Sequence, residues 1–148
     1  MSKLRAVLAA LAIAIASTSC AGAAAAPSAA SPAAQQTDGA LGEQAHEAGG
    51  VTVVASWLSG SPVARVTLDT HIIDLDGFDL MKLARLRLDG GAWVAPSLWD
   101  APEGGHHRSG MLAFDSLDAR AIGSARVIEL KIRDVAVPSH LLRWERAR

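Results

Sequence analysis

Histidines and aspartates, which can bind a metal ion or move a proton, gather in two short stretches of this chain. Residues 68–80 read LDTHIIDLDGFDL and residues 104–110 read GGHHRSG. Imidazole and carboxylate groups together suit zinc or copper(II), and also manganese or iron(II). One interpretation is therefore a metal site, most simply for zinc or copper(II). Its candidate ligands are Asp69, His71, Asp74, Asp76, His106 and His107.

A structural interpretation explains the same residues without a ligand, and we prefer it. Aspartates at strand ends commonly accept hydrogen bonds from the backbone and so stabilise turns. Arg108 can pair with Asp74 or Asp76 and hold one stretch against the other. We call this expected arrangement the latch. Under this interpretation the protein needs no cofactor.

Neither stretch has the pattern of a catalytic site. Ser109 lies near His107, but the Gly-x-Ser-x-Gly turn that exposes a nucleophilic serine is missing from the sequence. Asp74 and Asp76 are separated by Leu75, so their carboxylates are expected to point apart and not to act as an acid–base pair. The sequence therefore predicts a protein that is not an enzyme.

The first residues of the chain predict export. Lys3 and Arg5 precede an apolar run at 6–16, which small residues follow at 17–20. This order is typical of a secretory signal peptide, and the apolar run is too short to span a bilayer permanently.

The end of this signal indicates lipidation. Thr18-Ser19-Cys20 is similar to the end of a bacterial lipobox, although Ser17 stands where that motif usually has an aliphatic residue. We expect residues 1–19 to be the signal peptide and Cys20 to be acylated, because several acyl chains anchor a protein stably to a membrane. Ordinary cleavage after Ala23 is the alternative.

Residues 20–50 are expected to be a disordered tether. They consist largely of alanine, serine, proline, glutamine and glycine, which cannot bury enough apolar surface to offset the loss of chain entropy. His46 lies in this segment and is expected to be solvated.

From residue 51 the pattern changes to short runs in which apolar and polar residues alternate, as in half-buried strands. Asp89-Gly90-Gly91 is a strong hairpin signal, and Pro138 is expected to end the strand before it. A helical turn is expected at 78–83, and a long loop at 96–110. The expected strands are 51–57, 64–68, 84–88, 92–95, 111–115, 128–132 and 141–145.

Seven short strands in about a hundred residues predict that residues 51–148 form an all-β domain of the immunoglobulin-like sandwich class. A small β-barrel is the alternative. Trp93, Trp99 and Trp144 could form an exposed platform that binds a sugar or a peptide. We expect Trp57 and Trp144 in the core instead, and Trp99, in the long loop, is also expected there.

Charge and cysteine content exclude several classes. Lys and Arg number 14 against 15 Asp and Glu, so the chain lacks the basic excess of a nucleic-acid-binding protein. Cys20 is the single cysteine, so the folded domain has no disulfide and no thiolate nucleophile.

Both motif stretches also resemble a known family. Leu68-Asp-Thr-His71, Asp74-Leu-Asp76 and Gly105-His-His-Arg-Ser-Gly110, followed by an apolar strand and Ile132-Arg-Asp-Val135, are similar to motifs of an uncharacterised family of small exported bacterial proteins, many of them lipoproteins. The similarity covers residues 51–144. It implies a shared fold and location, and it implies no activity.

Together these observations predict a non-catalytic binding module that is tethered to the bacterial cell membrane and faces the periplasm or the exterior. Its expected partner is an envelope protein or a small ligand. The alternative is an exported metal-binding protein that uses His71, His106 and His107.

Overall fold

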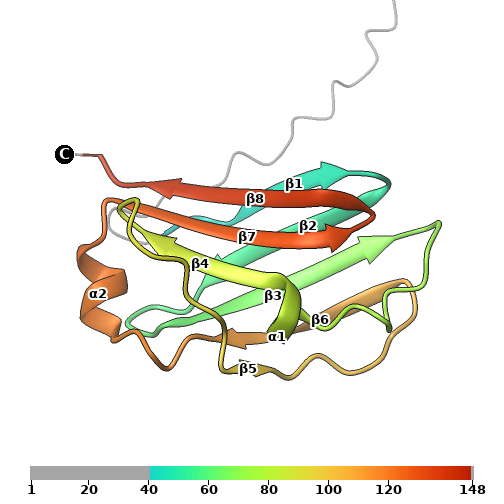
Figure 1. Ribbon diagram of the computed structural model, residues 1–148, viewed down its shortest axis with the longest axis horizontal. Helices are drawn as coiled ribbons and strands as arrows, with labels where there is room; N and C mark the ends of the chain where they lie inside the picture. The colour runs from blue at the N-terminus through green and yellow to red at the C-terminus, as the bar shows by residue number, and fades with distance from the viewer. Residues whose placement is uncertain (1–40, 148) are drawn as a thin grey trace, which may run out of the picture. The chain divides into compact units, whose positions relative to one another are not determined.

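The computed structural model describes residues 41–147 (Figure 1). The predicted signal peptide, the lipidation site Cys20 and most of the predicted tether lie outside these residues. The described part consists of strands with two short helices. In chain order the elements are β1 Gln44–Ala48, β2 Val51–Trp57, β3 Val63–Thr70, α1 Leu80–Leu83, β4 Ala84–Leu88, β5 Leu98–Trp99, β6 His107–Ala113, α2 Ala119–Ser124, β7 Val127–Val135 and β8 Val137–Glu145.

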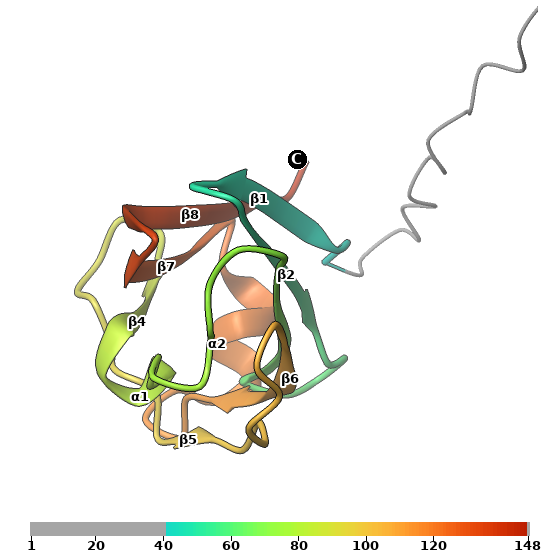
Figure 2. The same ribbon diagram turned by 90° about the vertical axis from the view of Figure 1, so that its right-hand side faces the viewer.

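These strands form two antiparallel sheets that face each other (Figures 1 and 2). The larger sheet has the order β1-β2-β3-β6-β5, and the smaller sheet has the order β4-β7-β8. β1 and β8 lie side by side where one edge of each sheet meets (Figure 2). Within residues 41–147 the strands do not close into a ring, so the small barrel, our alternative, is wrong. The structure is a two-sheet, sandwich-like β domain.

Alternation along the strands produces the core, as predicted. Along most of β2, β3, β4, β7 and β8, alternate residues are buried between the sheets, because successive side chains of a strand point to opposite faces. Fully burying a leucine or isoleucine side chain contributes about 1.5–3 kcal/mol. Trp144 lies in this core, and the half-buried Trp57 contacts it with ring centroids 5.7 Å apart.

The boundary of the predicted tether is wrong, because β1 lies inside it. β1 pairs with β2 along its whole length, with His46 opposite Val53. Gly49 and Gly50 have φ angles of 61° and 73°, which suit the tight turn of a two-residue hairpin. Pairing with β1 also covers the edge of β2 that would otherwise expose unpaired backbone groups.

The predicted loop at 96–110 is also partly wrong. β5 lies within it and pairs with β6, and β6 already begins at His107. The predicted strand at 92–95 is reduced to a single bridge between Leu86 and Val94, because β4 forms its ladder with β7. Asp89 and Gly90 do form the predicted turn, with φ angles of 46° and 74°.

Pro138 does not separate two elements as predicted, because it lies within β8, close to its start. β8 is hydrogen-bonded on one side only, to β7, and a proline is tolerated in such an edge strand. The reversal from β7 to β8 occurs at Asp134 and Ala136, whose φ angles are 59° and 56°.

Both helices begin at an aspartate. Asp79 accepts a hydrogen bond from the Met81 amide at the start of α1, which lies in the predicted helical turn. Asp118 accepts one from the Ala121 amide at the start of α2, which the sequence analysis did not predict. Neither helix of the described part is long and apolar enough to cross a membrane.

Candidate functional site

The two motif stretches meet at one end of the larger sheet because β3 and β6 are neighbours. The register places Asp69 opposite His107. Beyond this pair the chains stay in contact: the Thr70 amide donates to the His106 carbonyl at 3.0 Å, and the Leu75 amide donates to the Gly105 carbonyl at 2.7 Å. Loop 71–79 therefore lies against the segment that leads into β6.

Arg108 connects these loops, through backbone carbonyls. Its side chain comes from β6 and is 7% exposed. The planar guanidinium carries several fixed N–H donors, which suits it to carbonyls that converge from different directions. The Arg108 donors reach both loops: Nη1 donates to the carbonyls of Leu75 at 3.0 Å and Phe78 at 2.8 Å, Nε to Pro102 at 3.1 Å, and Nη2 to Ala101 at 3.2 Å.

Asp76 makes the reciprocal contacts. Its Oδ1 atom accepts hydrogen bonds from the amides of Gly104 at 2.8 Å and Gly105 at 3.1 Å. The same oxygen lies 3.9 Å from Arg108 Nε, at the outer limit of an ion pair. Asp74 accepts a hydrogen bond from the Asp76 amide at 2.8 Å, which stabilises its own turn. The latch therefore includes the expected Arg108–Asp76 ion pair, but most of its contacts are hydrogen bonds to backbone groups.

Three of the six candidate metal ligands lie near one another. His107 Nδ1 is 2.9 Å from Asp69 Oδ1, and the rings of His71 and His107 are 6.2 Å apart at their centroids. His106 is exposed and contributes its carbonyl to the strand contact. Within residues 41–147 no three histidine, aspartate, glutamate or cysteine side chains are grouped so that they could hold a metal ion.

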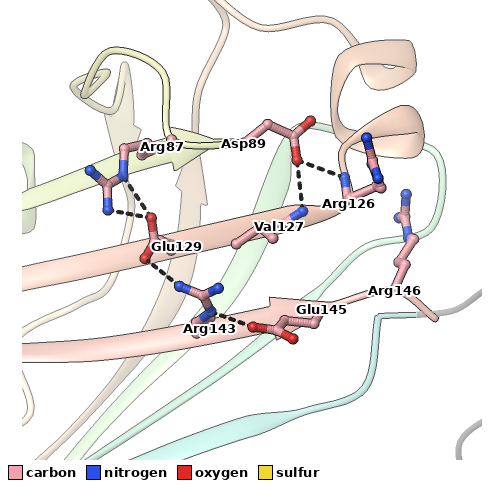
Figure 3. A pocket seen from close by; sticks show the side chains of 9 residues that line it. Arg87, Asp89, Arg126, Val127, Glu129, Arg143, Glu145 and Arg146 are labelled. Carbon is pink, nitrogen blue, oxygen red and sulfur yellow. Dashed lines mark hydrogen bonds and ion pairs between the residues drawn. The ribbon is translucent and has the colours of Figure 1, made fainter. Parts of the chain in front are cut away.

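The outer face of the smaller sheet carries a charged cluster that the sequence analysis missed (Figure 3). At its centre Glu129 is only 4% exposed. Arg87 Nε donates to Glu129 Oε2 at 2.6 Å, and Arg143 Nη1 donates to Glu129 Oε1 at 3.1 Å. Arg143 Nε also donates to Glu145 at 2.7 Å, and this hydrogen bond raises the pKa of Arg143.

Hydrogen bonds between side chains and backbone groups stabilise the same end of the sheet. Asp89 Oδ1 accepts hydrogen bonds from the amides of Arg126 and Val127, each at 2.9 Å, and so fixes the start of β7 against the turn after β4 (Figure 3). Arg146 donates to the carbonyls of Ile122 and Ala125 at 3.2 Å, and so holds the end of α2. Arg87, Glu129 and Arg143 occupy outward positions of the predicted strands, but which of them pair depends on strand register.

At the opposite end of this face, cationic side chains lie beside a tryptophan ring. Arg85, Trp93, Lys131 and Arg133 line a surface hollow of about 370 Å³. The Lys131 ammonium lies 4.3 Å from the centroid of the Trp93 ring, and the Arg87 guanidinium lies 4.4 Å from it. Trp93, Trp99 and Trp144 do not form one exposed platform, because Trp144 is in the core.

No family model matches the chain, and no curated protein and no solved structure matches it either.

Proposed function

We propose that the chain is an exported, lipid-anchored and non-catalytic binding module with an immunoglobulin-like fold. Strand order supports the fold assignment. When β1 is set aside, the orders β2-β3-β6-β5 and β4-β7-β8 correspond to the ABED and CFG sheets of an immunoglobulin constant-type domain. β1 then precedes the first strand of that arrangement. Domains of this architecture host many functions, so the function has to be argued from the surface.

The use of Arg108 and Asp76 is the observation that carries the non-catalytic proposal. In the most chemically promising part of the sequence, these two side chains direct their polar atoms to the backbone of the two loops. Buried polar groups need hydrogen-bond partners, and these contacts provide them for both the side chains and the loop carbonyls. The motif residues thus support the loops, and binding is left to the exposed faces of the sandwich.

The lipid anchor rests on Cys20 and its preceding small residues, and the proposed location is the outer side of a bacterial cell membrane. Growth of expressing cells with a labelled fatty acid tests this. The label should be incorporated into the full chain and be absent from a Cys20→Ala variant. Incorporation that persists in the variant would contradict the assignment.

Metal binding is the second candidate function, and the proximity of Asp69, His71 and His107 favours it. Thermal melts of the chelator-treated full chain distinguish metal binding from the proposed binding module. Zinc, copper(II), manganese and calcium are added separately. A metal present at 100 times its dissociation constant would add about 2.7 kcal/mol to the free energy of unfolding. We expect no saturable rise in melting temperature with any of the ions.

His107→Ala and Glu103→Ala complete this experiment as test and control. Both side chains are exposed, but Glu103 takes no part in the His71–His107 pair. A rise in melting temperature that is lost in His107→Ala and kept in Glu103→Ala would establish metal binding as the function.

A further inference from the structure

On the outer face of the smaller sheet, one half is neutralised by ion pairs and the other half is not. In the first half, Arg87 and Arg143 share the buried Glu129, and Arg143 also pairs with Glu145. In the second half stand Arg85, Lys131 and Arg133. Across residues 41–147 these three cations form no salt bridge with any carboxylate. The contrast lies within one sheet face, so overall charge does not explain it.

Strand register makes this second half electrostatically unfavourable. Arg85 lies directly opposite Lys131 in the β4–β7 ladder, and like charges in such a cross-strand pair are destabilising. Arg133 is two residues further along β7 and therefore projects from the same face. Arg85 donates to the carbonyls of Lys82 and Ala84 through Nη1, which holds the guanidinium in place without neutralising it. An anion bound between these groups would remove the repulsion.

Trp93 gives the hollow a shape that favours a protein ligand. Its ring makes cation–π contacts with Arg87 and Lys131. These contacts hold the two cationic groups beside the hollow. Beside Lys131, in register on β8, Leu141 is 42% exposed. Tryptophan and arginine are the residues most enriched at the energetic centres of protein–protein interfaces. The hollow of about 370 Å³ is large enough for one or two side chains.

We propose that this hollow binds an acidic polypeptide segment of a partner protein, whose carboxylates lie between Arg85, Lys131 and Arg133. The inference deepens the proposed binding function and rests on it. Arginine supplies paired N–H donors that match a carboxylate, and the exposed Leu141 supplies apolar contact beside the charges. Complementary charge of this kind speeds association and selects the partner.

Calorimetric titration of the full-length protein with an oligoglutamate peptide tests the proposal. The test variant is Lys131→Gln/Arg133→Gln, because neither side chain donates a hydrogen bond within the described part of the chain. The matched control is Arg65→Gln/Arg120→Gln, which removes the same charge from exposed positions on β3 and α2. We expect saturable binding that is about tenfold weaker in the test variant, unchanged in the control and reduced by added salt.

Other outcomes overturn the proposal. Equal weakening in both variants would show attraction to net charge alone. Binding to phosphatidylglycerol vesicles without binding to oligoglutamate would identify a membrane surface as the ligand. No binding to either would show that the hollow is not an anion site. None of these results contradicts the proposed non-catalytic binding function. That proposal is contradicted by a different result, a rise in melting temperature with a metal ion that is lost in His107→Ala. Thermal melts of each variant confirm that it is folded.

Discussion

The Nδ1 atoms of His46 on β1 and His140 on β8 lie 3.1 Å apart and join the two sheets at their common corner. His140 is fully buried, and its Nε2 atom lies 2.9 Å from the Val135 carbonyl. Because a carbonyl can only accept, Nε2 of His140 donates to it, and the two Nδ1 atoms share a second hydrogen bond in which one donates to the other. Both residues are outside the two histidine motifs, and His46 belongs to the segment that was predicted to be solvated.

Replacing His46 by alanine should therefore destabilise the whole domain. The substitution leaves the buried Nδ1 of His140 without a partner, which costs about 1–3 kcal/mol. Chemical denaturation of the full chain measures this loss. Glu47→Ala is the matched control, because Glu47 is the next residue of β1 and is exposed. Equal stability of the two variants would mean that β1 does not depend on this hydrogen bond.

Arg108→Lys should lower the free energy of unfolding by about 3 kcal/mol, although it keeps the positive charge. A lysine ammonium cannot reach carbonyls on both loops at once, as the guanidinium does. Denaturation curves give the difference. Arg65→Lys, on an exposed position of the neighbouring strand β3, should leave stability unchanged. An unchanged free energy of unfolding in Arg108→Lys would show that positive charge alone holds the two loops together.

Gly110→Ala should destabilise the domain because there is no room for a methyl group. A Cβ atom at this position of β6 would lie 2.5 Å from the amide nitrogen of Ala101 and 2.6 Å from its Cα. Relieving such a contact requires backbone movement, which typically costs about 1–3 kcal/mol. At Gly77 a Cβ atom would meet nothing within 4 Å, so Gly77→Ala serves as the control. Comparable melting temperatures for both variants would refute the predicted close approach.

Stability at pH values below 3.8 should depend on Asp79. The hydrogen bond from Lys82 lowers the pKa of this carboxyl below its ordinary value of 3.8. Since the folded pKa is depressed, the stabilising contribution is complete above 3.8 and is lost as the pH falls through the folded pKa.

Denaturation midpoints at a series of pH values below 5, for the full chain and for Asp79→Asn, test this prediction. The midpoint of the unsubstituted chain should fall more steeply with acidification than that of the variant. Asp115→Asn, at an exposed position, should follow the unsubstituted chain. If the denaturation midpoints of all three proteins fell equally with pH, Asp79 would not contribute to the loss of stability in acid.

Several features could be predicted from the sequence because their causes are local. Alternation in β2, β3, β7 and β8 reports directly which side chains face the core, so the two-sheet class follows from it. Asp89-Gly90 predicts its turn because glycine and aspartate tolerate the positive φ angles found there. The two histidine-rich stretches were also singled out correctly as neighbours, since each stands at the end of a predicted strand.

Tertiary structure decided what depends on strand neighbours. A polar segment such as Gln44–Ala48 becomes a strand only because the open edge of β2 lies beside it. Arg108 contacts carbonyls rather than Asp74 because the register of β3 and β6 directs its side chain between the loops. The cationic hollow at Trp93 exists because β4 and β7, more than forty residues apart in the chain, place Arg85 opposite Lys131. Periodicity indicates which face a residue occupies, whereas the residue across from it is chosen by the packing of the whole domain.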